Sequence, residues 1–222
     1  MLDKLYRLKE IIKHPINIYD RYYYLTHSLS FDDFIKAVTG AKEYEQYSNE
    51  YVTTGFKDEK RKFLFLITRI VKPNIVVETG VGASTKAILC AMNLNKYGSL
   101  YSIDLLPQNV CDDGSDYSKN KPLNFLQECD TERWQFIQGD SKVKLPELLN
   151  KLYKIDMFFH DSLHTYEHML YEYQTAWKYI NKGGLLLSDD VYYNHAFLQF
   201  SKGKEKYICN RYFGGIKVSD VQ

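Results

Sequence analysis

The most informative chemistry in the sequence lies in a short turn that carries two glycines and a carboxylate. The stretch reads Val76-Val77-Glu78-Thr79-Gly80-Val81-Gly82-Ala83-Ser84-Thr85. Gly80 and Gly82 let the backbone pass close beneath a ligand, and a helix beginning near Ala83 points its amide donors and positive dipole end at that ligand. Because Glu78 would repel a phosphate at this place, the turn favours a cationic or hydroxyl-rich ligand.

Two further acidic residues follow the next two predicted strands. Asp104 ends one strand, and the triplet Gly139-Asp140-Ser141 ends the other. In an open α/β sheet, a carboxylate in the position of Asp104 hydrogen-bonds the ribose hydroxyls of a nucleoside. Asp140 is then an acceptor where an adenine amino group could sit. Since ligands bind outside the carboxyl ends of such strands, these residues are expected to line one crevice.

Three more carboxylates lie at the ends of the following two strands. Asp161 follows the run Phe158-Phe159-His160, and Asp189 with Asp190 follows Leu187-Ser188. Carboxylates that converge on one cleft repel one another unless a cation compensates them, and all-oxygen ligands suit Mg²⁺ or another hard divalent ion. The alternative is structural, because Asp161 and Asp190 each precede a helical run and could be N-caps.

The elements that must position these residues alternate in character along the chain. From Pro73 onward, short apolar runs alternate with helical segments, which is typical of β-α-β units and a parallel sheet. The expected strands are 75–77, 100–103, 134–137, 155–159 and 184–187. The expected helices are 58–71, 83–95, 121–130, 143–152 and 165–180, the last ended by Gly183 and Gly184.

The two ends of the chain differ from this alternation. Residues 1 to about 55 show apolar residues at helical spacing, so a helical N-terminal segment is expected. Segments 206–209 and 215–218 predict a terminal antiparallel hairpin. The fold class is therefore α/β, with a Rossmann-like, mostly parallel sheet of about seven strands and helices on both faces. We divide the chain into a helical N-terminal appendage over 1–56 and a main domain over 57–222.

Composition excludes several functional classes. Lys and Arg number 29 against 28 Asp and Glu, so a net charge of +1 over 222 residues leaves no excess positive charge for a nucleic-acid backbone. No apolar stretch approaches the ~20 residues that span a bilayer, and the N-terminus carries no secretory signal pattern. The four cysteines are too widely spaced to indicate a disulfide framework or a zinc site. We expect a cytoplasmic protein that binds neither nucleic acid nor membrane.

On the strength of these residues, the segment from about Pro73 to Val218 resembles a class I S-adenosylmethionine-dependent methyltransferase. The resemblance implies S-adenosylmethionine as cofactor, with Glu78 facing its amino-acid end, Asp104 holding the ribose and Asp140 bordering the adenine. The implied cofactor site comprises Glu78, Thr79, Gly80, Gly82, Ser84, Asp104, Asp140, Ser141 and Asp161.

The three later carboxylates are similar to those of a narrower branch, the metal-dependent small-molecule O-methyltransferases. There, the counterparts of Asp161, Asp189 and Asp190 hold magnesium, and the base lies three residues after the first ligand, which here is His164. Catechol methyltransferases carry a lysine at that place, so the D-x-x-H-x-Y-E string over 161–167 looks more like the macrolide-sugar and natural-product enzymes. The resemblance implies methyl transfer to a hydroxyl of a small molecule, a sugar or natural product, with Mg²⁺ and a His164 base.

Two other functions stay open from the sequence. An NAD- or NADP-dependent oxidoreductase of Rossmann fold would also place an acid such as Asp104 on its ribose, although Glu78, and Ser84 in place of a third glycine, disfavour it. A non-catalytic nucleoside-binding or scaffold protein could retain the same fold. The sequence does not identify the acceptor, because the tyrosines at 22–24 and 192–193 could stack on a ligand ring, pack internally or form a homo-oligomer contact.

Overall fold

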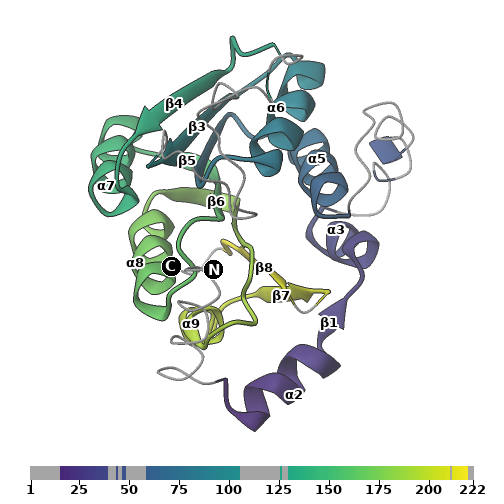
Figure 1. Cartoon of the computed structure of the whole chain (residues 1–222). Coiled ribbons are helices and arrows are strands. Elements are labelled where there is room, and N and C mark those ends of the chain that lie inside the picture. Colours follow the sequence, from purple (N-terminus) through teal and green to yellow (C-terminus); the bar gives the residue numbers. More distant parts are fainter. Residues whose placement is uncertain are drawn as a thin grey trace, which may run out of the picture.

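The computed structural model describes residues 16–39, 44, 47–48, 59–105, 126, 130–210 and 212–219. These residues build one eight-stranded sheet in the order β1-β7-β8-β6-β5-β2-β3-β4, with helices on both faces (Figure 1). The strands are β1 (Ser28–Leu29), β2 (Ile75–Thr79), β3 (Ser99–Asp104), β4 (Trp134–Gln138), β5 (Ile155–His160), β6 (Ile180–Ser188), β7 (Lys206–Cys209) and β8 (Phe213–Lys217).

All strand pairs are parallel except the two that involve β8, which is antiparallel to both β6 and β7. The predicted Rossmann-like sheet and terminal hairpin are therefore confirmed. The eighth strand is β1, which pairs with β7 at the sheet edge. At two residues it is too short to produce an alternating pattern in the sequence.

The described helices form two layers around the sheet. They are α2 (Ile18–Thr26), α3 (Phe31–Thr39), α5 (Glu59–Val71), α6 (Ala83–Asn95), α7 (Ser141–Leu152), α8 (Tyr166–Trp177) and α9 (Ala196–Phe200). Helices α3, α5 and α6 lie on one face, and α7, α8 and α9 lie on the other (Figure 1). None of the described helices is long and apolar enough to cross a membrane.

Side chains that alternate in direction along each strand explain why helices cover both faces of the sheet. Phe159 of β5 packs with the layer of α5 and α6, whereas its neighbour Phe158 packs with the layer of α7 and α8. Val76 and Val77 of β2 divide between the layers in the same way. Successive side chains of a strand point to opposite faces, so a strand that is apolar throughout needs helices on both sides.

One predicted boundary is wrong. The expected helix 165–180 ends at Trp177, and Gly183 with Gly184 lies inside β6 instead of stopping that helix. The pairing of β6 with β5 is irregular just there, and Gly183 has φ +78°, a left-handed conformation. A Cβ on Gly184 would lie 2.6 Å from the backbone oxygen of Asp156. The glycines therefore permit a bulge in a strand, a use that sequence alone does not separate from a helix stop.

Several predictions fall on parts of the chain that the structure does not describe. The helical pattern in residues 1–12, Cys111, Cys129 and nearly all of the expected helix 121–130 lie there. Cys90 and Cys209 are free thiols. Helix α3 packs on α5 and reaches β7. The division of the chain at residue 56 stays a prediction.

Candidate active site

The glycine turn joins β2 to α6, and its two glycines have different roles. Gly80 has φ +92° and donates its N–H to the carbonyl of Ile103 at 2.9 Å. A Cβ on Gly80 would overlap the backbone carbonyl of Asp161, so this position requires glycine. Gly82 is extended, and among the described residues no atom lies within 4 Å of where its Cβ would be. The backbone at Gly82 therefore borders open space.

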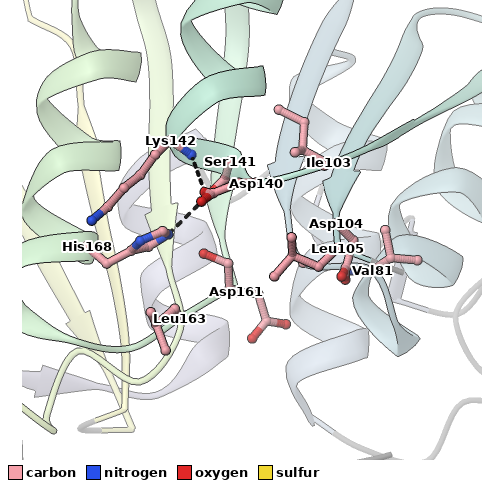
Figure 2. Close-up of a pocket in the computed structure, with 13 residues that line it drawn as sticks. Val81, Ile103, Asp104, Leu105, Asp140, Ser141, Lys142, Asp161, Leu163 and His168 are labelled. Atoms are coloured by element: carbon pink, nitrogen blue, oxygen red, sulfur yellow. Dashed lines mark hydrogen bonds between the residues drawn. The ribbon is translucent and has the colours of Figure 1, made fainter. Parts of the chain in front are cut away.

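A pocket of about 420 Å³ opens beside this turn at the carboxyl ends of β2, β3, β4 and β5 (Figure 2). We call it the strand-end pocket. Of the predicted cofactor residues, those that line it are Gly80, Asp104, Asp140, Ser141 and Asp161. The others lie outside its wall, namely Glu78, Thr79, Gly82 and Ser84. Lys142, Ser162 and His168 also line the pocket, and none of them was among the predicted cofactor residues.

Backbone amides hold two acids that line this pocket at the ends of the neighbouring strands β3 and β4. Oδ2 of Asp104 accepts from the N–H of Val81 at 2.8 Å, which ties the end of β3 to the glycine turn. Oδ1 of Asp140 accepts from the N–H of Lys142 at 2.8 Å and so caps α7. Ser141 places its hydroxyl 3.0 Å from Nε2 of His168 (Figure 2). These acids are fixed by hydrogen bonds to the chain itself.

Glu78 is fully buried beneath the turn. Its Oε1 accepts from the hydroxyl of Ser102 at 2.5 Å, and that hydroxyl accepts in turn from the indole of Trp134 at 2.8 Å. Burial raises the pKa of Glu78 to about 8, against the opposing effect of the Ser102 hydrogen bond. Within the described part of the chain, Oε2 has no hydrogen-bond partner. The site therefore holds a buried acceptor that needs either a proton or a donor.

Thr79 turns away from the pocket toward a buried carboxylate that sequence reasoning missed. Its hydroxyl donates to Oε2 of Glu172 at 2.6 Å, and Nδ1 of His160 lies 2.6 Å from the same oxygen. Oε1 of Glu172 accepts from Ser162 at 3.0 Å and lies 2.7 Å from Nε2 of His168. Burial alone would raise the pKa of Glu172, but the two histidines outweigh it and hold that pKa well below its usual range.

A second group, the charged rim, lies next to the strand-end pocket. It comprises Lys60, Asp161, His164, Asp189 and Asp190. Asp161 belongs to both groups, because it also lines the pocket. The structure thus brings together the predicted base and all three predicted metal ligands.

Lys60 was not among the predicted site residues. Its Nζ lies 2.8 Å from Oδ2 of Asp161 and 2.5 Å from Oδ2 of Asp189, and 5.6 Å from the centre of the Phe159 ring. Burial raises the pKa of Asp161 to about 7, with Asp189 adding to the rise and Lys60 opposing it. The pKa of Asp189 is lowered because Lys60 outweighs the effect of burial. One ammonium is therefore shared between two carboxylates.

His164 lies between two of the acids. Its Nε2 is 3.9 Å from Oδ1 of Asp161, and its Nδ1 is 3.8 Å from Oδ2 of Asp190. Its side chain is 11% exposed. The buried side chain of Asn194 donates to the backbone oxygen of His164 at 3.2 Å. Asn194 therefore fixes the loop that carries the histidine.

Helix capping does not account for the acids of the rim. Helix α8 is capped by Thr165, whose hydroxyl accepts from the N–H of His168 at 3.4 Å. Helix α9 follows His195 and has no side-chain cap. Asp190 instead adopts a left-handed φ of +52°, which is uncommon for a residue other than glycine. Neither Asp161 nor Asp190 is thus an N-cap.

Solved structures share this fold. PaMTH1, a methyltransferase from Podospora anserina with S-adenosylhomocysteine bound, is 17% identical, with a TM-score of 0.57 over 93% of this chain and 98% of that one. CalS11, a TDP-rhamnose 3'-O-methyltransferase of calicheamicin biosynthesis, is 15% identical, with a TM-score of 0.55 over 86% and 94%. MycE, a methyltransferase of mycinamycin biosynthesis in complex with Mg and S-adenosylhomocysteine, is 15% identical, with a TM-score of 0.52 over 81% of this chain and 56% of that one.

The likeness to these structures confirms the expected methyltransferase fold. No curated protein matches the sequence. A family model described as a methyltransferase domain matches residues 77–191, which is more than half of the chain and runs from the glycine turn to the charged rim. The chain therefore belongs to this family of methyltransferase domains.

Proposed function

We propose that this protein transfers a methyl group from S-adenosylmethionine to a hydroxyl oxygen of a small molecule, of the sugar or natural-product class. The observation that carries the proposal is the position of Asp161. Its side chain lines the strand-end pocket and also lies 3.9 Å from the imidazole of His164. A methyl donor in the pocket would therefore lie next to a methyl acceptor beside the histidine. Methyl transfer needs the two groups to be aligned in this way.

The strand-end pocket has the donors and acceptors that this cofactor needs. Asp104 offers a carboxylate to the ribose hydroxyls, and the exposed side chain of Asp140 borders the place for the adenine. Glu78 lies outside the pocket wall, but its Oε2, which has no hydrogen-bond donor among the described residues, suits the cationic amino group of the methionine end. Thr79 and Ser84, whose side chains bond Glu172 and approach Asp161, would support the turn instead of touching the cofactor.

His164 is the proposed general base. When bound, S-adenosylmethionine supplies a methyl carbon whose bond to sulfur breaks as its bond to the acceptor oxygen forms. Nε2 of His164 accepts the proton that the acceptor hydroxyl loses. Asp190, 3.8 Å from Nδ1, stabilises the imidazolium that results, and the hydrogen bond from Asn194 to the backbone keeps the ring in place.

The residues as arranged do not fit the predicted magnesium ion. Oxygen and nitrogen atoms of Asp161, His164 and Asp189 do converge within 4.8 Å of one another, and carboxylates suit a hard cation. However, the ammonium of Lys60 already bridges two of these carboxylates. A divalent ion, such as the Mg named with MycE, is the alternative arrangement, and it would require Lys60 to leave.

The acceptor would lie toward the tyrosine-rich segment after Asp190. A smaller cavity of about 210 Å³ there is lined by Ile16, Arg21, Tyr192, Tyr193 and Tyr212. Aromatic faces with hydroxyl groups suit a sugar or another ring. Cytoplasmic location and self-association are further predictions from the sequence.

Calorimetric titration tests the cofactor assignment against the two alternatives. We expect S-adenosylmethionine and S-adenosylhomocysteine to bind, and Asp104→Ala to weaken both by roughly 10–100-fold through loss of charge-assisted ribose hydrogen bonds. Exposed Glu132→Ala, just before β4, is the matched control and should bind normally. Binding of NADH in place of both nucleosides would support the oxidoreductase alternative. Binding without turnover across a broad acceptor panel would favour the non-catalytic one.

A further inference from the structure

Lys60 lies where the acids of the rim would hold a metal ion. Its Nζ makes hydrogen bonds of 2.8 Å to Asp161 and 2.5 Å to Asp189, through one carboxylate oxygen of each. A magnesium ion shared by the same two oxygens would sit about 2.0–2.1 Å from each. Because Nζ lies 2.5 Å from the Asp189 oxygen, such an ion would be at most about 4.6 Å from the ammonium nitrogen. Because two cations so close repel strongly, Lys60 and a divalent ion exclude one another at this place.

The lysine is built into the site by its helix. Lys60 lies in the first turn of α5, and the following residues of that helix, from Phe63 to Ile70, are buried. The side chain passes over the ring of Phe159 and is 31% exposed, while those of Asp161 and Asp189 are 21% and 17% exposed. Removing one partner from a largely buried ion pair leaves an uncompensated charge, so the lysine is not displaced without cost.

We propose that Lys60 is the resident cation of the acceptor site, and that methyl transfer by this chain needs no divalent metal ion. This inference rests on the proposed function. Among the described residues, two carboxylates take two of the three donors of the ammonium, and the third would hydrogen-bond the acceptor oxygen. Such a bond orients the hydroxyl and stabilises the oxyanion character that develops as His164 takes the proton.

The charges of the rim agree with this assignment. Three carboxylates and one ammonium leave the rim anionic. That surplus faces His164, the group that gains a positive charge during the reaction. An anionic surround stabilises the imidazolium, whereas an added divalent ion would oppose its formation.

Binding of Mn²⁺ to the full-length protein tests the assignment without relying on turnover. Electron paramagnetic resonance should show no specific Mn²⁺ site in the wild type or in Lys62→Gln. Lys62 is the matched control, since it lies on the same helix with the same 31% exposure and pairs with Asp32. Lys60→Gln removes the internal cation, and it should bind one Mn²⁺ per chain. Adding Asp189→Asn to that variant should abolish the new site.

Activity then gives the second arm of the experiment. Wild-type turnover should be unchanged by excess chelator, and Lys60→Gln should be slowed roughly 10–100-fold, the worth of a charge-assisted hydrogen bond, with partial rescue by Mn²⁺ or Mg²⁺. A wild-type enzyme that binds Mn²⁺ through Asp189 and loses activity in chelator would overturn the proposal while leaving methyl transfer intact. If Lys60→Gln does not fold, the wild-type binding and chelator results decide alone. Failure of S-adenosylmethionine to bind would instead contradict the proposed function.

Discussion

The strand-end pocket and the charged rim meet at Asp161 but are held together in different ways. In the pocket, Asp104 and Asp140 accept from backbone amides, so their positions follow from the turns that end the strands. In the rim, the side chain of Lys60 bonds those of Asp161 and Asp189, and His164 lies 3.8–3.9 Å from the carboxylates of Asp161 and Asp190. These described contacts are between charged or titratable side chains. The pocket should therefore be sensitive to changes in the backbone, and the rim to changes in charge.

A change at Gly80 should have the largest effect, because it strains the backbone of the pocket. Gly80→Ala places a Cβ against the carbonyl of Asp161 at a φ of +92°. We expect a loss of more than about 4 kcal/mol in the free energy of unfolding, measured by chemical denaturation.

The neighbouring glycine supplies the control for that experiment. Gly82→Ala meets no neighbouring atom within 4 Å in the described structure, so it should fold with nearly wild-type stability. It should instead weaken cofactor binding, because the new methyl group enters the space beside the pocket. Equal destabilisation by the two substitutions would contradict the distinction between them.

Replacing His164, the proposed base, tests whether the charged rim takes part in methyl transfer. His164→Ala should slow single-turnover methyl transfer by about 10²–10⁴-fold, the usual worth of a positioned base. Cofactor affinity should stay within a small factor of the wild-type value, because the ring lies outside the pocket lining. A variant that transfers the methyl group at the wild-type rate would remove His164 from the mechanism.

Two buried glutamates sharpen the comparison, since their pKa values shift in opposite directions. Glu172 has four partners and a lowered pKa, so its ionised form contributes stability above its unfolded pKa of about 4.5. That stability is lost as pH falls toward the lower folded pKa. Glu172→Gln should reduce the free energy of unfolding near pH 7 by about 2–4 kcal/mol. Denaturation at several pH values should also show a shallower loss of stability in acid, and an unchanged acid limb would contradict this role.

Glu78 should behave in the opposite sense and with a smaller effect. Its pKa is raised to about 8, so stability is fully present below about pH 4.5 and is lost as pH rises through about 8. Glu78→Gln should remove this alkaline loss and stabilise the ligand-free protein at about pH 9 by roughly 1–2 kcal/mol.

Cofactor binding gives a separate check on Glu78. If its carboxylate faces the amino group of S-adenosylmethionine, binding near pH 7 should release a proton from the wild type, because the added positive charge lowers the pKa of Glu78. Calorimetry in buffers of different ionisation enthalpy measures that proton. Equal proton release by Glu78→Gln would place its source elsewhere.

The sequence predicted those parts of the site whose signals are local. The glycine turn, Asp104 and Asp140 follow directly from strand ends, and His164 from its spacing to Asp161. Lys60 was not predicted as a site residue, because it lies 101 residues before Asp161 and no neighbouring sequence motif indicates that the two side chains meet. Glu172 was missed for a similar reason, since three of its four partners come from β2, β5 and the loop after β5, and only His168 lies on its own helix.

Two glycines and one short strand account for the errors in the predicted secondary structure. Gly183 and Gly184 were interpreted as a helix stop, but the pairing irregularity between β5 and β6 that they permit depends on a distant strand. β1 has only two residues, and its place beside β7 is decided by tertiary packing. Patterns within a segment predicted the element types, whereas contacts between segments decided these details.

The central claim is that the methyl group of S-adenosylmethionine reaches an acceptor hydroxyl at the charged rim. Incubation of the purified protein with S-adenosylmethionine carrying a deuterated methyl group and a panel of sugars and natural-product scaffolds tests it directly. Mass spectrometry should find the deuterated methyl group on an oxygen of the product, together with S-adenosylhomocysteine, and His164→Ala should form far less of both. A cofactor that binds but leaves no label on any acceptor, or a label found on nitrogen or carbon, would contradict the account.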